Sequence, residues 1–460
     1  MFSSASSLPR RIAAAVLACA AVNIPFAAQA DDQPPARQEF TSGTVQHDLS
    51  AAIDSAQKRV TAARTEANTK PLQLSDALVA LADAEREAGI YNQAEASYRE
   101  ALEIVQKETG PTNSRRLAPL RGLGLTLASQ TKHEEAVPYL ARALELSRRT
   151  DGLFNTGQFE MLNQLATSEA ILKDYETAQQ HIEYLQKIGE YAYGKRDPRM
   201  IPVTCTVADW WATVRAYITA RLIYQRAIAL GKKTLGSNDL ALVRPLRSIA
   251  RTYVAELVDL SDHASEGIRV RRDSMHLGGH GTDEPGPDPK ALSSDGEQAL
   301  QRAIKILEAH PNARAELADT LLQLGDWYMI KQDRDEAMPV YARVAELAKQ
   351  DAAAAAALSL PLRLYYPLPP ILISSRRVPP GEASERFVLL EYSVTEAGDV
   401  SEARVVETNA PARQANQILE ALRNSTFRPK FVGSTPVNAN TIQYREVYRV
   451  RGDEADEQDS

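Results

Sequence analysis

The chain has 460 residues, of which 53 are Lys or Arg and 60 are Asp or Glu, so its formal net charge is −7. This acidic balance argues against a general nucleic-acid binder, which needs a basic surface. The length exceeds what a single hydrophobic core usually holds, so at least two structural units are expected.

Residues 1–30 have the pattern of a secretory signal peptide. Arg10 and Arg11 precede an apolar run from residue 12 to residue 26, and Ala28-Gln29-Ala30 places small residues at the two recognition positions of a cleavage site. Cleavage after Ala30 would leave a chain with a more acidic balance. The sequence therefore predicts export, and no later segment is apolar enough to predict a membrane span.

Two alternatives to cleavage remain open. An uncleaved anchor is one, but Asn23 and Pro25 shorten the apolar run below the roughly 20 residues that a bilayer core requires. A lipoprotein anchored at Cys19 is the other, although Leu17 stands where that signal usually has a small or β-branched residue. Cys205 is the only cysteine after residue 30, so no disulfide within the exported chain is expected.

Residues of one type recur every 42 positions, which indicates a repeat architecture. Alanine, glycine and large apolar residues each keep this period through four copies. The aligned sets are Ala94, Ala136, Ala178 and Ala220; Gly110, Gly152, Gly194 and Gly236; Tyr98, Leu140, Ile182 and Tyr224; and Leu81, Leu123, Leu165 and Val207. Spacings of three and four predict two amphipathic helices per unit, and the glycines are expected to end each second helix in a left-handed conformation.

This pattern resembles a tetratricopeptide repeat in the 42-residue form of kinesin light chains. Leu324-Gly325-Asp326-Trp327-Tyr328, followed by Ala337 and Tyr341, reproduces the family's L-G-x-x-Y and A-x-x-x-F/Y arrangement. The resemblance implies an α-solenoid over residues 49–359, after a flexible linker at 31–48. It would open with a capping helix at 49–68, and a Gly-, Pro-, Asp- and Ser-rich loop at about 263–296 would interrupt it.

In this family the first helices line a concave face that binds proteins. Carrying the family pattern onto this chain gives a set of expected partner-contact residues. They are Asp76, Asp83, Arg86, Arg121, Glu160, Asn163, Asp209, Asp319 and Asp326. Together they suggest a mixed, mostly acidic groove suited to a partly basic peptide. The alternative for each residue is an ordinary solvated helix face.

A second structural unit is expected over residues 360–451, because prolines cluster after the alanine run at 352–357. Alternating apolar residues predict strands at 387–394 and 400–407, joined by a hairpin turn at Ala397-Gly398-Asp399. A helix is predicted after them at 413–424, and two further strands at 427–432 and 441–450. The acidic tail at 452–460 is expected to be disordered.

These residues in this order resemble the C-terminal domain of the energy-transducing protein TonB. The matching stretch runs from Glu391-Tyr392-Ser393-Val394 through Gly398-Asp399-Val400 to Phe427-Arg428-Pro429. The resemblance implies a small α+β fold that binds peptides. The strand at 441–450 would be an edge able to accept an extended partner, or one that Arg445 and Arg449 protect.

TonB-type transducers keep an uncleaved inner-membrane helix and a long proline-rich spacer, and this chain has neither. Energy transduction for outer-membrane transport is therefore only an alternative, and it requires residues 12–28 to be retained as an anchor.

The sequence predicts no catalytic constellation and no cofactor. His276 and His280 lie near Asp283 and Glu284, which makes a metal site conceivable, but the glycines between them favour a flexible loop without preset geometry. Cys205 has no histidine in register, so a catalytic thiol is not expected.

Two further motifs are expected to serve packing. Gly122-Leu123-Gly124 lies inside a predicted helix and lacks the strand-loop-helix context of a phosphate loop. Trp210, Trp211 and Trp327 fall on predicted first helices and are expected in the core. The two resemblances together imply a non-catalytic periplasmic adaptor. Its partners would be proteins or peptides of the cell envelope, with an outer-membrane transporter or cell-wall material among the candidates.

Overall fold

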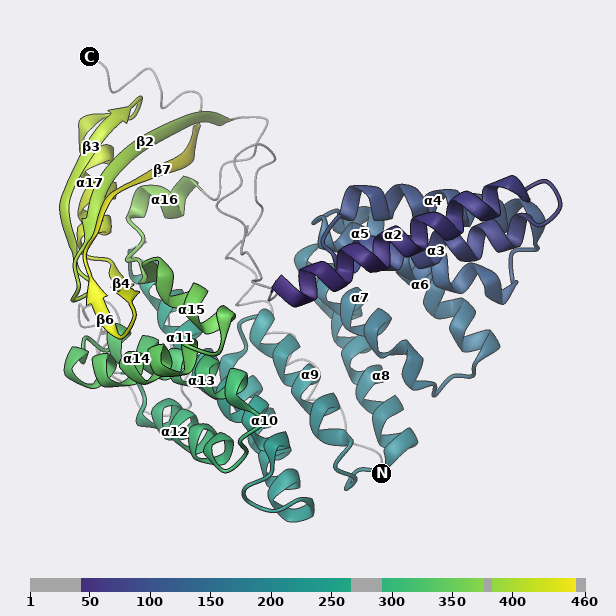
Figure 1. The fold of residues 1–460 in the computed structure, drawn as a ribbon, viewed down its shortest axis with the longest axis horizontal. Helices are drawn as coiled ribbons and strands as arrows, with labels where there is room; N and C mark the ends of the chain where they lie inside the picture. The colour runs from purple at the N-terminus through teal and green to yellow at the C-terminus, as the bar shows by residue number, and fades with distance from the viewer. Residues whose placement is uncertain (1–42, 266–291, 376–382, 452–460) are drawn as a thin grey trace, which may run out of the picture. The chain divides into compact units, whose positions relative to one another are not determined.

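The structure is a computed structural model that describes residues 43–265, 292–375 and 383–451 (Figure 1). The predicted signal peptide, the His276/His280 loop and the acidic tail lie outside these residues. The chain divides into two compact units, residues 1–237 and residues 238–460. Among the described helices, none combines the length and the apolar character needed to cross a bilayer.

The first unit consists of helices that pack in consecutive antiparallel pairs after a single opening helix, α2 (Gly43–Thr65). The helix predicted at 49–68 thus begins six residues earlier, inside the predicted linker. The pairs are α3 (Pro71–Glu87) with α4 (Tyr91–Glu108), α5 (Leu117–Ser129) with α6 (His133–Thr150), α7 (Phe159–Ile171) with α8 (Tyr175–Tyr193), and α9 (Met200–Thr213) with α10 (Tyr217–Thr234).

The 42-residue period is a packing period. The aligned alanines of the second helices, Ala94, Ala136, Ala178 and Ala220, are all fully buried. The large residues one turn later are buried with them, at Tyr98, Leu140, Ile182 and Tyr224. Small and large side chains therefore alternate at the contact between the two helices of each pair, which confirms the predicted helix pairs.

The glycine prediction is confirmed in three repeats and wrong in one. Gly152, Gly194 and Gly236 have φ angles of 92°, 87° and 98°, in the left-handed region. Gly110 is not among the residues of positive φ. Its helix ends at Glu108, and the next residue, Thr109, is extended (φ −136°, ψ 157°), so the chain leaves α4 without a left-handed residue.

A recurring Asn or Asp, which the sequence analysis missed, introduces the first helices. In each case the side-chain oxygen accepts the backbone N–H two residues later, which satisfies a donor that the start of a helix leaves unpaired. The donor–acceptor distances are 3.0 Å at Asn113, 2.7 Å at Asn155, 2.8 Å at Asp197 and 2.9 Å at Asp239. Three of them precede single 3₁₀ turns, at Ser114–Arg116, Thr156–Gln158 and Leu240–Leu242.

The second unit begins with five further helices. They are α11 (Val243–Ser265), α12 (Ser294–Glu308), α13 (Arg314–Ile330), α14 (Arg334–Ala348) and the short α15 (Ala352–Ser359). Helices α11 and α12 pack against each other, and both extend into the ends of the loop predicted at about 263–296, whose middle lies outside the described residues. Helix α15 was not predicted. It consists largely of the alanine run, and the Asp351 carboxylate caps it by accepting the N–H groups of Ala353 and Ala354.

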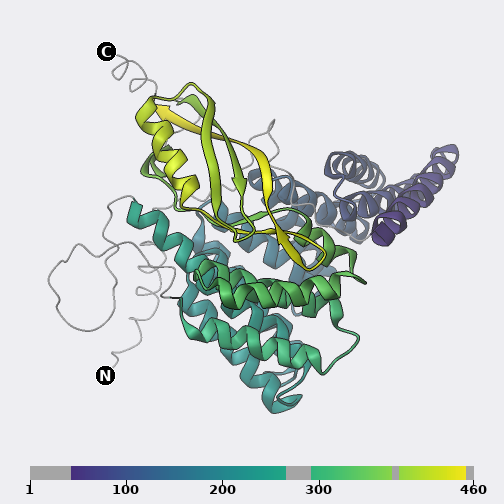
Figure 2. The same cartoon turned by 60° about the vertical axis from the view of Figure 1, so that its left-hand side comes forward.

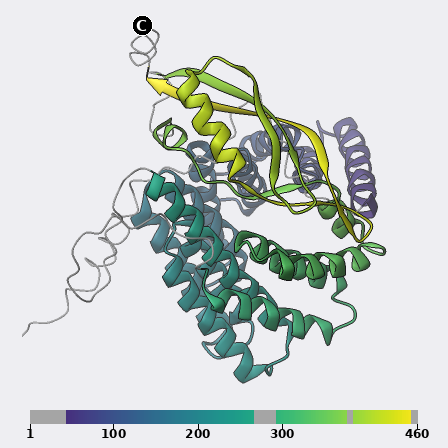
Figure 3. The same ribbon diagram turned by 90° about the vertical axis from the view of Figure 1, so that its left-hand side faces the viewer.

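The C-terminal module of this unit comprises residues 362–451, and its described strands form three small antiparallel sheets. The central sheet has the order β3-β2-β7, formed by β2 (Ala383–Val394), β3 (Val400–Thr408) and β7 (Ala439–Arg451). Helix α17 (Ala412–Arg423) lies along one face of it (Figures 2 and 3). The inward side chains of β2, Val388, Leu390 and Val394, are fully buried and pack with Ile418 and Leu422 of α17.

The remaining elements of the module differ from the prediction. The predicted strand at 427–432 is two short strands, β4 (Thr426–Arg428) and β5 (Lys430–Val432), interrupted by Pro429, which has no N–H to donate. Strand β4 pairs with β1 (Leu362–Tyr365), and β5 pairs with β6 (Thr435–Val437). Neither β1, β6 nor the short helix α16 (Pro370–Ser375) was predicted.

Candidate functional site

The expected partner-contact residues all lie on first helices, but they differ in exposure. Glu160 and Asp319 are exposed, and the side chain of Asp76 is 64% exposed although it forms an ion pair with Arg115 at 2.9 Å. Arg121 and Asn163 are half-buried. These five residues present charge and hydrogen-bonding groups to solvent from helices whose other faces are buried.

Three of the expected contact residues also hold the two helices of a pair together. The hydroxyl of Tyr98 donates to the Asp83 carboxylate at 2.5 Å, and the hydroxyl of Tyr341 donates to Asp326 at 2.7 Å. Tyr224 and Asp209 make the same contact. Each tyrosine is buried, and its partner precedes it by 15 residues in all three pairs. We name this arrangement the Asp–Tyr pair.

The aspartate is present in those repeats in which the buried residue of the second helix is a tyrosine. The two intervening repeats have Leu125 with Leu140 and Thr167 with Ile182 at the same positions. A buried phenol needs a hydrogen-bond acceptor, whereas leucine and isoleucine need none. Burial, and next the contact with Asp83, raises the pKa of Tyr98, so its hydroxyl stays protonated and donates.

The Asp–Tyr pair of the first repeat lies beside a cation from its own helix. Arg86 follows Asp83 by three residues on α3 and interacts with both Tyr98 and Asp83. Its Nε is buried without a hydrogen-bond partner. The charge of Arg86 therefore serves the pair in addition to any role at the surface.

In the last repeat the cation comes from the C-terminal module. Arg428 is 6% exposed, and its Nε and Nη2 donate to the two oxygens of Asp326 at 2.8 and 2.6 Å. Its Nη1 donates to the carbonyl of Ala357 at 2.9 Å. Asp326 was expected to contact a partner, but within the second unit its carboxylate is already engaged by this arginine.

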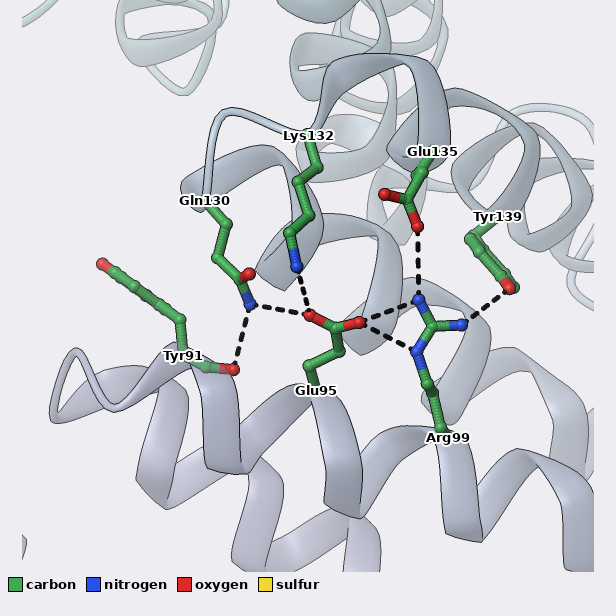
Figure 4. Close-up of polar contacts among 7 residues, drawn as sticks. All are labelled: Tyr91, Glu95, Arg99, Gln130, Lys132, Glu135 and Tyr139. Carbon is green, nitrogen blue, oxygen red and sulfur yellow. Dashed lines mark hydrogen bonds and ion pairs between the residues drawn. The ribbon is translucent and has the colours of Figure 1, made fainter. Parts of the chain in front are cut away.

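A polar seam of charged residues joins the first two repeats (Figure 4). Glu95 on α4 accepts from Gln130 Nε2 at 3.0 Å, Lys132 Nζ at 2.9 Å and Arg99 Nε at 2.9 Å. Arg99 also donates to the hydroxyl of Tyr139 at 3.2 Å. The residues lie on and just before second helices, so this seam joins repeats and lies apart from the predicted groove.

The polar seam controls the charge of Glu95. Burial alone would raise the pKa of this carboxyl group, but hydrogen bonds from Lys132, Arg99 and Gln130 outweigh burial and leave the pKa below its usual value. Glu95 is therefore a carboxylate at neutral pH. Sequence reasoning missed the seam because its contacts join residues more than 30 positions apart that do not follow the 42-residue period.

Buried glycines explain the Gly122-Leu123-Gly124 motif. A Cβ at Gly122 would lie 2.2 Å from Cε1 of Tyr98, and one at Gly124 would lie 2.6 Å from Cγ of Leu140. In the last repeat, a Cβ at Gly325 would lie 2.4 Å from Cε1 of Tyr341. These glycines leave room for the large side chains of second helices, so the motif serves packing as predicted.

The remaining candidates for chemistry also have packed environments. Cys205 and Trp327 are buried, Trp210 is 3% exposed, and Trp211 packs half-buried against the core. His133 lies 3.1 Å from the hydroxyl of Ser168, and burial lowers the pKa of this histidine. Among the described residues, no group of three or more His, Cys, Asp or Glu side chains is placed to hold a metal ion.

Comparison with known proteins identifies the repeats. Residues 73–149 and residues 320–355 each match a family model of the tetratricopeptide repeat. The chain therefore carries tetratricopeptide repeats in both units. Neither match reaches the strands of the C-terminal module, and the resemblance of that module to TonB stays a prediction. No curated protein matches the sequence.

Several solved structures are similar to this chain at low identity. BtubC (BKLC) from P. vanneervenii is 17% identical over 66% of this chain and 91% of its own, with a TM-score of 0.33. A kinesin light chain with nearly identical TPR-like repeats from Podosopora anserina is 16% identical over 52% and 98%, with a TM-score of 0.39. A Rap protein complexed with Competence and Sporulation Factor is 16% identical over 68% and 73%, with a TM-score of 0.37.

Proposed function

We propose that this chain is a non-catalytic protein-interaction scaffold of the bacterial periplasm. Its tetratricopeptide repeats would hold one protein or peptide partner, and its C-terminal module would contact another in the cell envelope. The first part rests on the repeats themselves, because stacked helix pairs of this kind build extended protein-binding surfaces. The location rests on the pattern of residues 1–30.

The observation that carries the proposal is the exposure of acidic residues on helices that otherwise serve packing. Asp76, Glu160 and Asp319 project to solvent from α3, α7 and α13. Exposed acidic residues add little to stability, even where one is ion-paired as Asp76 is with Arg115. Acidic residues on the first helices of either unit favour basic segments and speed their approach.

Recovery of partners from a cell-envelope extract tests this role. The exported chain should retain protein partners, and the triple variant Asp76→Lys, Glu160→Lys, Asp319→Lys should retain fewer, because like charges would then oppose a basic segment. A matched control reverses three exposed acidic residues of second helices, Glu103, Glu134 and Glu176, and should retain the same partners as the unmodified chain. Equal recovery by both variants, or no partner under mild conditions, contradicts the proposal.

The C-terminal module offers an edge strand for the second contact. In the described sheets β7 pairs with β2 only, and its other edge carries backbone groups that can pair with an extended segment. The N–H of Arg449 already donates to the hydroxyl of Ser375 at 2.6 Å, and Arg445 lies over the ring of Phe387 at 3.9 Å. The accessible stretch is therefore the part of β7 that precedes Arg449.

The alternative is a TonB-type energy transducer held by an uncleaved N-terminal anchor. N-terminal sequencing of the protein recovered from cells separates the two. A chain that starts at Asp31 supports the exported scaffold and removes the anchored transducer. A chain that retains residues 12–28 and sediments with inner membranes reverses this conclusion.

A further inference from the structure

We propose that the last repeat carries a binding site for an arginine side chain, and that Arg428 of the chain's own C-terminal module is its internal ligand. An arginine-bearing segment of a protein partner would then occupy the site only in exchange for Arg428. The exchange step rests on the proposed scaffold function, whereas the site itself does not.

The site has the geometry that suits a guanidinium group. The two oxygens of Asp326 face Nε and Nη2 in a bidentate arrangement, which favours arginine over lysine. The carbonyl of Ala357 belongs to the last turn of α15, where helix carbonyls lack intrahelical partners and the helix dipole is negative. Carboxylate and helix end therefore meet one cation from two sides.

Most of this site is formed by residues of the repeat itself. Tyr341 fixes one oxygen of Asp326, and its ring lies against Gly325, where any side chain would clash. The same Asp–Tyr pair is found in the first repeat, where Arg86 of the same helix supplies the cation. Met329 occupies the position equivalent to Arg86 in the last repeat, and Arg428 of the C-terminal module supplies the cation there.

The contacts around Arg428 join the C-terminal module to the helix pair of the last repeat. Phe431 meets the ring of Tyr341 edge-on, with centroids 5.6 Å apart. Gly398 lies so close to Met329 that a Cβ at Gly398 would be 2.5 Å from Cε of Met329. Next to it, Arg334 forms an ion pair with Asp399. Of these two ion pairs, Arg428–Asp326 is the more deeply buried, so it supplies the preference for a guanidinium group, while the other contacts add apolar and solvent-exposed contact.

Chemical rescue tests the site in the full chain. Arg428→Ala leaves the Asp326 carboxylate without its cation, so we expect the thermal midpoint of the second unit to fall by roughly 10 °C. Millimolar N-ethylguanidinium should recover much of this loss, whereas the neutral N-ethylurea should not. The double variant Arg428→Ala, Asp326→Asn should not respond to either compound. Absence of rescue, or equal rescue by the urea, overturns the site.

A peptide tests the exchange. The probe is a labelled peptide of residues 425–433, which contains Arg428, and its binding is followed by fluorescence anisotropy. It should bind the Arg428→Ala chain at least about tenfold more tightly than the unmodified chain, and the same peptide with lysine at that position should bind roughly tenfold more weakly. Equal binding to both chains shows that Arg428 does not occupy the site. Binding to neither overturns the exchange.

Two safeguards keep these outcomes interpretable. If Arg428→Ala does not fold, Arg428→Lys retains the apolar stem and the charge but not the bidentate contact, and the peptide comparison is made with that variant. None of these measurements uses an outside partner. Failure to recover partners from envelope extract would therefore refute the scaffold and leave the arginine site standing. Recovery of partners without guanidinium rescue would refute the arginine site and leave the scaffold standing.

Discussion

The residue type tolerated at a position is often determined by a side chain of an adjacent helix. Gly122 on α5, which faces Tyr98 on α4, is the clearest example. Glycine in a helix is normally unfavourable by about 0.5–1 kcal/mol relative to alanine. Here the ring of Tyr98 occupies the space where a Cβ would lie, at 2.2 Å. The clash therefore decides the sign of a substitution, and helix propensity does not.

We predict that Gly122→Ala lowers the free energy of unfolding of the first unit by about 1–3 kcal/mol, the usual range for overpacking a core. Urea unfolding followed by circular dichroism measures the change. The control is the double variant Gly122→Ala, Tyr98→Leu, in which the smaller side chain makes room and the two effects should be far from additive. A stabilised Gly122→Ala chain would show that the two helices separate readily.

A second prediction concerns acid and the polar seam. Because the pKa of Glu95 is lowered in the folded chain, its contribution to stability is fully present above its unfolded pKa, near 4.5, and is lost as pH falls through the folded value. Glu95→Gln should therefore destabilise the chain at pH 7, and the difference should shrink as pH falls below about 4.5. Urea midpoints across this range measure it. Glu103→Gln, an exposed residue on the same helix, is the control, and a pH-independent difference at Glu95 would contradict the prediction.

The residue scale is also where sequence reasoning was weakest. It correctly assigned Gly122, Trp210 and Trp327 to packing, because their positions follow from helical spacing. It did not find that Asp83 and Asp326 hold tyrosines, although the 15-residue spacing between each aspartate and its tyrosine is visible in the sequence. The family pattern predicts which residues lie on the exposed side of a first helix. It does not predict which of them accepts a hydrogen bond from a buried tyrosine of the second helix.

At the scale of elements, the turn between the two helices has one left-handed residue in each of the five helix pairs whose turn the structure describes. In the first repeat it is Gly89, with φ 76°. The equivalent residues Thr131, Lys173, Arg215 and Gln332 have φ of 62°, 69°, 62° and 62° although each has a Cβ. This conformation costs residues other than glycine roughly 1–2 kcal/mol, and it is worst for β-branched side chains.

We therefore predict that Thr131→Gly stabilises the first unit. Relief of the left-handed strain outweighs the added freedom of glycine in the unfolded chain, and the net gain should be about 0.5–1 kcal/mol. Thermal or urea unfolding measures it, and Thr131→Ala, which keeps a Cβ, should give no such gain. A destabilised glycine variant would mean that the threonine side chain makes a contact worth more than the strain.

Element prediction succeeded where periodicity is strong and failed where elements are short. The 42-residue period gave the helix pairs, and alternation gave β2, β3 and β7, because both patterns report burial over many residues. Strands β1 and β6 have four and three residues, too few for a pattern, and they exist because β4 and β5 pair with them. The asparagine and aspartate caps did follow the period, and a search for polar as well as apolar recurrence would have found them.

At the scale of the whole molecule, the first unit is a one-dimensional array. Each helix packs mainly on those before and after it in sequence, so stability should be close to a sum of repeat and neighbour terms. A local defect should then loosen its own repeat and the adjacent ones more than distant ones.

Hydrogen exchange in the first unit tests this expectation. Gly124→Leu places a large side chain against Leu140, where even a Cβ would lie 2.6 Å from Cγ, and should open α5 and α6. Amide exchange should accelerate most in α4 to α7, and least in α10. Uniform acceleration through all helices of the unit would instead indicate a single cooperative core.

The position of Gly122 has a consequence for how such a chain can change over evolutionary time. This glycine belongs to the second helix pair, yet the side chain it accommodates, Tyr98, belongs to the first. If a 42-residue block were duplicated or transposed alone, the space at its glycine would face a different side chain from the one it fits. The preceding block would have to move with it to keep the contact. The repeats share one helix-pair pattern, but each is fitted to its own neighbour. Their order along the chain is therefore constrained as well as their sequences.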